Sequence, residues 1–123
     1  MKVIQTNDAP AAVGPYSQAI ELDSLVFASG QIALDPKTGE LAQGIEAQAH
    51  QALKNAQAVI KASGALWENV IKTTVFITNI DDFGKVNEIY ATYFDKPYPA
   101  RSCVEVNKLP KGALIEVEVI AKK

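Results

Sequence analysis

The sequence predicts an α+β domain in which two amphipathic helices cover one face of a mixed sheet. Two segments repeat apolar residues at three- and four-residue spacing, the period of a helix that packs on one side. About five or six shorter segments are β-branched or alternate apolar and polar residues, as strands do. Two helices and five or six strands in one small domain typically pack as a layer of helices on one face of a sheet.

Length and composition indicate a single domain over residues 1–123. A chain of 123 residues has the common size of one domain and can bury about two-thirds of its unfolded surface. Its 48% hydrophobic and 21% charged residues are typical of a globular protein. The chain contains no repeats, low-complexity tracts or linkers. We therefore expect one core without further division.

The N-terminal part of the chain predicts short strands. Five turn-forming residues lie within positions 7–15 (Asn7, Asp8, Pro10, Gly14 and Pro15), and Asp23-Ser24 separates two extended runs in the manner of a hairpin. The turn at 35–39 ends this region. The expected strands are residues 2–5, 18–22, 25–29 and 31–34.

Two helices and three strands are predicted for the rest. The first helix runs from Ile45 to near Gly64, and the second starts at Asn79 and stops before Pro97. The second helix has the apolar stripe Phe83, Val86, Tyr90, Tyr93 and Phe94. The expected strands are residues 70–78, 100–106 and 113–121, the first with Ile71, Thr73, Val75 and Ile77 on one side.

One sheet face is expected to need a cover. Leu25-Val26-Phe27-Ala28 is apolar at odd and at even positions, which is typical of a strand buried on both sides. Both helices are expected on a single face. We therefore infer that a partner subunit covers the other.

Charge and composition argue against several classes of protein. The net charge is −2 and the twelve Lys and Arg residues are scattered, so nucleic acid is an improbable partner. No segment approaches the ~20 apolar residues of a membrane span, and the first eight residues lack the apolar region of a secretory signal. A cytoplasmic location is the expectation. Cys103 and His50 are the only residues of their kinds, so neither a disulfide nor a structural metal is expected.

Three side chains on the last two predicted strands are candidates for a functional site. Side chains alternate along a strand, so Ser102, Val104 and Val106 oppose Arg101, Cys103 and Glu105, while Ile115, Val117 and Val119 oppose Leu114, Glu116 and Glu118. If the two strands are neighbours and their valines share the helix-covered face, the polar set shares the other face. That set is Arg101, Cys103 and Glu116.

Arg101 and Glu116 each allow two interpretations. The planar guanidinium of Arg101 is suited to a carboxylate ligand, and the alternative is a structural ion pair with Glu116 or Glu118. Glu116 can position and deprotonate a water or hold a cationic nitrogen, and its alternative is an interface salt bridge.

Further candidates surround these strands. Tyr16 either anchors its loop or offers its hydroxyl to a ligand. Ser29 lacks the setting of a hydrolase nucleophile, and Gly30 permits close approach of the backbone. Asn87, on the apolar stripe of the second helix, holds a loop or contacts a ligand. Cys103 lacks an evident activating neighbour, so a role as a small hydrophobe is favoured over one as a nucleophile.

At these residues the chain resembles the RidA family of reactive-imine deaminases, nearly end to end. The similar segments are 14–19 (GPYSQA), 29–31 (SGQ), 68–76 (ENVIKTTVF), 86–90 (VNEIY), 99–102 (PARS), 109–110 (LP) and 115–117 (IEV). The resemblance implies a chorismate-mutase-like fold and a homotrimer whose sheets surround a central barrel, with clefts between subunits. It further implies hydrolysis of 2-iminobutanoate and 2-iminopropanoate to 2-oxo acids and ammonia, without cofactor or metal.

The resemblance also implies roles for individual residues. Arg101 would clamp the substrate carboxylate, Glu116 would hold the attacking water, and the Cys103 backbone would orient the imine nitrogen or the water. The cleft would be completed by Tyr16, Ser29, Gly30 and Asn87.

A competing interpretation is a trimeric ligand-binding or regulatory module that keeps the cleft without turnover. Similar family sequences are linked to chaperone-like, RNA-cleaving and translation-inhibiting roles. The acidic balance disfavours the RNA-linked roles, and Glu116 favours an enzyme, because a simple carboxylate binder needs only Arg101.

Overall fold

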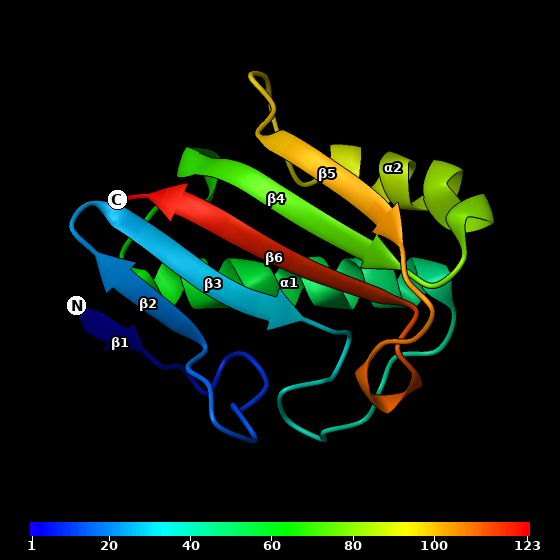
Figure 1. Cartoon of the computed structure of the whole chain (residues 1–123), viewed down its shortest axis with the longest axis horizontal. Coiled ribbons are helices and arrows are strands. Elements are labelled where there is room, and N and C mark those ends of the chain that lie inside the picture. The colour runs from blue at the N-terminus through cyan, green and yellow to red at the C-terminus, as the bar shows by residue number, and fades with distance from the viewer.

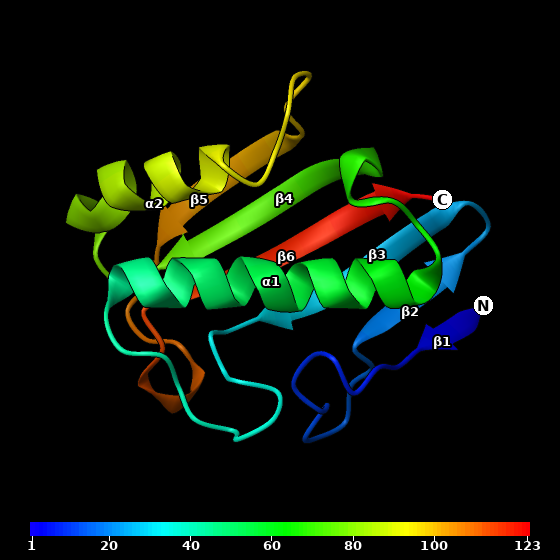
Figure 2. The same cartoon turned by 180° about the vertical axis from the view of Figure 1, so that it is seen from behind.

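A six-stranded sheet carries both long helices on one of its faces in the computed structural model, which describes all residues 1–123 (Figure 1). Seen from behind, α1 runs along the sheet and α2 lies beside β4 and β5 (Figure 2). The strands are β1 Lys2–Ile4, β2 Ala19–Leu22, β3 Leu25–Gln31, β4 Val70–Ile77, β5 Ala100–Glu105 and β6 Ile115–Lys122. The helices are α1 Ile45–Ser63 and α2 Phe83–Ala91, with short 3-10 turns η1 Trp67–Asn69, η2 Ile80–Asp82 and η3 Pro110–Gly112.

The strand order is β1-β2-β3-β6-β4-β5. β4 and β5 run parallel and are joined through α2, whereas every other neighbouring pair is antiparallel. The mixed sheet, the hairpin at Asp23 and the two helices on one face confirm the predicted architecture. The predicted pairing of the last two strands is wrong, because β4 lies between β5 and β6.

The core lies between α1 and the sheet. Side chains at the helical spacing of α1 are fully buried, as are the alternate valines of the central strands. Leu53 and Ile60 are among the largest buried side chains of α1, and Val75 and Val117 face each other in the β4–β6 register. The apolar stripe of the helix and the alternation of β6 were therefore interpreted correctly.

The expected face of Arg101 and Cys103 is wrong. In the β4–β5 register Arg101 pairs with Thr73 and Cys103 with Val75, and both β4 residues are buried under the helices. Directly paired residues share a sheet face, so Arg101 and Cys103 lie on the helix side. Glu116 pairs with Phe76 and lies on the other side. The error came from matching valines across two strands that are not neighbours.

Four smaller expectations also differ from the structure. Ile71 is 47% exposed because the pairing of β4 with β6 shifts register between Val70 and Lys72. Residues 31–34 do not continue as a strand; Leu34 forms only an isolated bridge with Leu41. The second helix starts at Phe83, since Asn79 caps η2, and its predicted stripe residues Tyr93 and Phe94 lie beyond its end. Val104, predicted on the helix side, is exposed on the open face.

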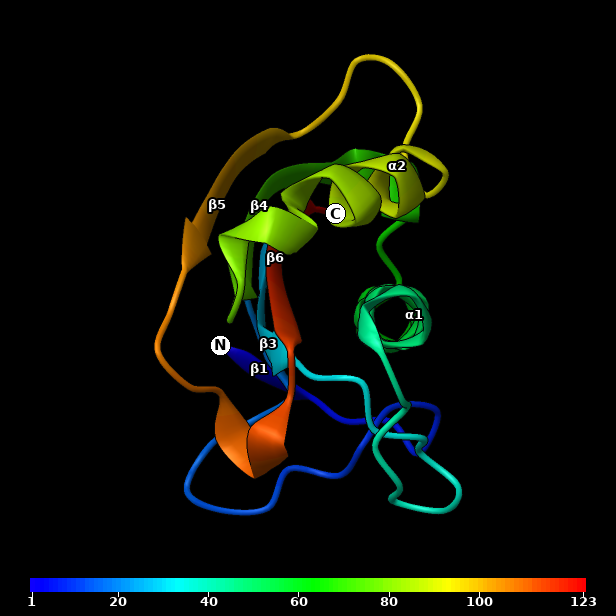
Figure 3. The same cartoon turned by 90° about the vertical axis from the view of Figure 1, so that its right-hand side faces the viewer.

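The second sheet face has no cover within the chain. Viewed from the side, α1 and α2 lie on one side of the sheet and no strand or α-helix lies on the other (Figure 3). Phe27 is 42% exposed and Val104 is 44% exposed there, whereas Val26 and Ala28 on the helix side are buried. The strand expected to be buried on both faces is thus buried on one face within a single chain.

No helix is long and apolar enough to cross a membrane. The structure also brings together no group of three or more His, Cys, Asp or Glu side chains that could hold a metal ion.

Candidate functional site

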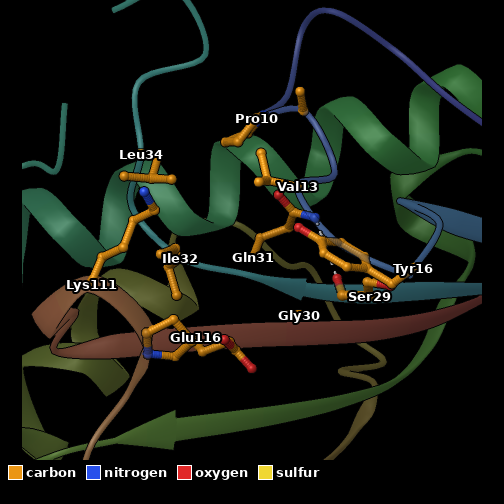
Figure 4. A pocket seen from close by; sticks show the side chains of 12 residues that line it. Pro10, Val13, Tyr16, Ser29, Gly30, Gln31, Ile32, Leu34, Lys111 and Glu116 are labelled. Atoms are coloured by element: carbon orange, nitrogen blue, oxygen red, sulfur yellow. Dashed lines mark hydrogen bonds between the residues drawn. The ribbon is translucent and has the colours of Figure 1, made fainter. Parts of the chain in front are cut away.

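A cavity of about 420 Å³ opens where β3 ends, between the loop that precedes β2 and the turn that precedes β6 (Figure 4). Figure 4 shows Tyr16 and Ser29 on one side of it, Leu34 and Lys111 on the other, and Glu116 reaching in from β6. The lining residues are Pro10, Ala11, Val13, Tyr16, Ser29, Gly30, Gln31, Ile32, Leu34, Pro110, Lys111 and Glu116.

Gly30 makes room for the side chain of Glu116. A Cβ atom at position 30 would come within 2.7 Å of Glu116 Cδ and 2.9 Å of its Cγ, and would meet Oε1 as well. The carboxyl group therefore lies directly against the Gly30 backbone. The expectation that Gly30 permits a close approach is consistent with this geometry.

An irregularity in β3 shapes this side of the pocket. The pairing of β3 with β6 shifts register between Ala28 and Gln31, which takes Ser29 and Gly30 out of the ladder. The Ser29 N–H donates to Gln18 O at 2.9 Å, and its hydroxyl donates to Ser17 O at 2.6 Å. Ser29 thus ties β3 to the Tyr16 loop, while Tyr16 itself is 52% exposed.

The pKa of the Glu116 carboxyl is raised above its ordinary value. Partial burial is the larger cause, and the negative charge of nearby Glu118 adds to it. Glu116 makes no ion pair in the chain, where the single salt bridge joins Lys123 Nζ to Glu21 Oε1 at 2.9 Å. A raised pKa of this kind is typical of carboxyl groups that take part in proton transfer.

Arg101 belongs to a second group of residues, between β5 and α2. Its Nη1 donates to Asn87 Oδ1 at 2.8 Å, and its guanidinium carbon lies 4.7 Å from the Tyr90 ring centroid and 5.5 Å from that of Phe83. Aromatic faces and one amide hold the fork while leaving other N–H groups unused. The adjoining cavity, of about 430 Å³, is lined by Asn87, Tyr90, Ala91, Tyr98, Pro99 and Arg101.

Cys103 lies beside this second group and is half-buried next to Val75. Burial raises the pKa of its thiol, and the Arg101 charge opposes that effect only as the lesser cause. The side chain packs against the core. This setting supports the interpretation of Cys103 as a small hydrophobe.

The predicted site residues are thus divided between two places. Tyr16, Ser29, Gly30 and Glu116 meet at the first cavity, and Arg101 contacts Asn87 at the second. The intrachain ion pair of Arg101 with Glu116 or Glu118, the alternative left open above, is not formed.

Sequence reasoning missed two parts of these cavities. The apolar wall of the first cavity comes from three separate non-strand segments whose residues show no period; it consists of Pro10, Val13, Ile32, Leu34 and Pro110. The aromatic support of Arg101 had a signal, because Phe83 and Tyr90 were on the predicted helical stripe. Their position under a cation required knowing that α2 packs beside β5.

The fold and these cavities define a class of protein: a small α+β domain with a carboxylate pocket and a separate arginine site, suited to small ligands. A profile of the family described as Endoribonuclease L-PSP matches residues 6–123. The chain belongs to this family, the RidA family that its motifs indicate.

Close relatives cover almost the whole chain. It is 50% identical to the 2-iminobutanoate/2-iminopropanoate deaminase of Mus musculus over 121 residues, which is 98% of this chain and 90% of that protein. It is 51% identical to the putative regulator AldR of Lactococcus lactis, covering 99% and 98% of the two chains. The crystal structure of E. coli TdcF with bound serine superimposes with a TM-score of 0.97 at 45% identity, over 100% and 99% of the chains. Because the superposition covers 100% of this chain, the two proteins share every helix and strand described above.

Proposed function

We propose that this protein hydrolyses reactive 2-imino acids, including 2-iminobutanoate and 2-iminopropanoate, to 2-oxo acids and ammonia. The observation that carries the proposal is the partly buried Glu116 carboxyl in an apolar pocket, where it lies against Gly30 because that residue has no side chain. The deaminase activity named for a relative at 50% identity supports it. A metabolic role in the cytoplasm, where such imines arise, forms part of the proposal.

The chemistry requires a carboxylate and a water. Ionised Glu116 accepts a proton from the water as the water oxygen bonds to the carbon of the protonated imine, and the π electrons of the C=N bond move to nitrogen to leave a carbinolamine with a neutral amine. Glu116 then returns that proton to the amine, the C–N bond breaks to release ammonia, and the hydroxyl gives its proton back to Glu116 as it becomes the carbonyl of the 2-oxo acid. Transfer of this last proton from Glu116 to ammonia restores the ionised carboxylate. No electron transfer occurs, so the proposed reaction needs no redox cofactor, and proton transfer by Glu116 needs no metal.

Arg101 is proposed as the clamp for the substrate carboxylate. Two parallel N–H donors match a carboxylate, and stacking on Tyr90 together with the Asn87 contact orients the fork. The backbone of Cys103, two residues along β5, is proposed to orient the imine nitrogen or the water. Tyr16, Ser29 and Gly30 would close the pocket around the reacting carbon.

The active site is proposed to be shared between subunits of a homotrimer. Arg101 and Glu116 lie on opposite faces of the sheet with β4 between their strands, so one small imino acid cannot touch both within a chain. Phe27 and Val104 are exposed on the open face of the sheet. A neighbouring copy that covers this face can bring its own Arg101 to Glu116. Three copies would close their sheets into the central barrel expected for this fold.

A second candidate is a ligand-binding regulator without turnover. The relative described as a putative regulator, at 51% identity, favours it. This function needs the Arg101 clamp but not proton transfer by Glu116. The two candidates therefore differ in what Glu116 does.

The deciding experiment measures ammonia release from imines that a threonine or serine dehydratase generates in situ. We expect the native chain to accelerate release, and both Arg101→Ala and Glu116→Gln to lower kcat/KM by about 10²-fold or more. Glu118→Gln, compared at a pH above the acid limb of the activity profile, is the matched control, because it removes an exposed carboxylate from the same strand and face. Absence of acceleration by the native chain would reject the enzyme and leave the regulator as the better account, whereas full activity of Glu116→Gln would show that Glu116 is not the base.

A further inference from the structure

We propose that two buried amide side chains of α1, Asn55 and Gln48, position the two walls of the Glu116 pocket. Asn55 fixes the apolar wall that meets the substrate side chain, and Gln48 fixes the start of the strand that carries Glu116. The inference rests on the proposed function for its kinetic consequences. Neither residue touches the substrate, so both are positioning residues.

Asn55 holds the apolar wall from behind. It is 1% exposed, and its Nδ2 donates to Ile32 O at 3.0 Å and to Leu34 O at 2.9 Å. Its Oδ1 accepts from Gln51 Nε2 at 2.9 Å, which fixes the orientation of the amide. The side chains of Ile32 and Leu34 line the pocket in front (Figure 4).

This wall has little other support. β3 ends at Gln31, so the carbonyls that follow have lost the strand ladder. The remaining backbone bonds of the segment are the two of the Leu34–Leu41 bridge, from Ala42 N to Ala33 O at 3.0 Å and from Asp35 N to Glu40 O at 2.9 Å. An amide NH₂ can satisfy two carbonyls at once, whereas a carboxylate of the same shape offers no donor.

Gln48 holds the other wall from the same helix face. It is 3% exposed and lies seven residues, about two turns, before Asn55. Its Oε1 accepts from Leu114 N at 2.8 Å, and its Nε2 donates to Ala42 O at 2.9 Å. Leu114 is two residues before Glu116 in β6, and Ala42 is bonded to the wall segment held by Asn55.

The two residues therefore predict different kinetic defects. Loss of Asn55 should displace Ile32 and Leu34, which changes how a long substrate side chain binds. Loss of Gln48 should displace the start of β6 and with it the Glu116 carboxyl, which changes the chemical step. A merely structural role would lower stability without separating KM from kcat.

The kinetic test compares Asn55→Leu and Gln48→Leu on the imino acids of leucine and alanine, made in situ by an amino-acid oxidase. For Asn55→Leu we expect KM to rise about tenfold for the leucine imine and to stay within about twofold for the alanine imine. For Gln48→Leu we expect kcat to fall about tenfold for both. Equal effects on KM and kcat for both substrates would overturn the proposal.

Isosteric variants guard against misfolding. Gln48→Glu keeps an acceptor for the Leu114 N–H and should retain kcat, whereas Asn55→Asp keeps at most one donor, in its protonated form, and should raise KM for the leucine imine as Asn55→Leu does. Ser63→Ala is the control: Ser63 is a buried polar residue of α1, 3% exposed, whose hydroxyl bonds only Ile60 O and Ala65 N. A kinetic change in Ser63→Ala as large as those above would also overturn the proposal.

Amide hydrogen exchange gives a readout that does not depend on enzyme activity. Asn55→Leu should speed exchange at Ala42, and Gln48→Leu should speed exchange at Leu114, with Ser63→Ala changing neither. Unchanged exchange refutes the positioning role even in an active enzyme. If the native chain has no deaminase activity, the proposed function fails, and weakened binding of 4-methyl-2-oxopentanoate relative to pyruvate in Asn55→Leu still tests the wall.

Discussion

At the residue scale, Glu116 is a titratable residue on a strand whose alternate side chains belong to the core. Its neighbours Ile115 and Val117 are buried under the helices, so Glu116 must face the other side of the sheet. Gly30 on β3 leaves the space that the carboxyl occupies. The position of the Glu116 carboxyl therefore depends on the absence of a side chain at Gly30 as well as on the place of Glu116 in β6.

Gly30→Ala should displace the Glu116 carboxyl while leaving the fold intact. The new Cβ would come within 2.7 Å of Glu116 Cδ, and the end of a flexible side chain can move away. We expect kcat/KM to fall about tenfold or more, with a thermal unfolding midpoint close to that of the native chain. Kinetics and calorimetry on the same preparations measure both.

The same substitution in a Glu116→Ala background provides the control. If the methyl acts through the carboxyl, it should cause no further loss there. An additional loss in that background would show that the methyl obstructs the ligand instead.

The pH profile should report the environment of Glu116. A base must be ionised, so activity falls as pH drops through its raised pKa, and Glu118 is one cause of that elevation. Glu118→Gln removes a negative charge and lowers the pKa of Glu116. We therefore expect the acid limb of the kcat/KM profile to move to lower pH. An acid limb that stays in place would assign the titration to another group.

At the scale of elements, α2 is attached to the sheet by one buried hydrogen bond and also supports Arg101. Thr73 of β4 is 0% exposed, and its hydroxyl lies 2.8 Å from the Tyr90 hydroxyl. The Tyr90 ring lies under the Arg101 guanidinium. Docking of the helix and orientation of the proposed clamp thus depend on the same side chain.

Tyr90→Phe should lower the free energy of unfolding by about 1–3 kcal/mol, because the buried Thr73 hydroxyl loses its partner. Thr73→Val added to it should restore most of that loss, since neither polar group then remains. Urea unfolding of both single variants and the double variant measures the coupling. The phenyl ring still supports Arg101, so deaminase activity should change little; additive losses of stability would contradict the coupling.

At the scale of the whole molecule, the strand order leaves one sheet face open and separates Arg101 from Glu116. β4 lies between the strands of Arg101 and Glu116, and both helices lie on one side (Figure 3). The exposed Phe27 and Val104 on the other side match the apolar core of an interface between copies. Assembly and activity should consequently be inseparable.

Mixing the inactive variants Arg101→Ala and Glu116→Gln should restore activity. If each site takes its arginine from one copy and its carboxylate from the next, random trimers contain both native groups at about a quarter of their sites. Ammonia release after mild dissociation and reassembly measures the recovery. Sedimentation at a trimer mass with no recovery would confine the site to one chain, and a monomer would refute the assembly.

The sequence by itself determined most of the elements, the core stripe of α1, the alternation of β6 and the presence of apolar residues on both faces of β3. These features follow from periods of 3.6 and 2 residues along the backbone, which are set by local geometry. Tertiary structure alone decided which strands are neighbours, and so placed Arg101 over Tyr90 on the helix side, away from Glu116. Strand order is set by hydrogen bonds between segments that are distant in the sequence and by the crossover connection through α2, which joins β4 to β5. No period in the sequence encodes those long-range pairings.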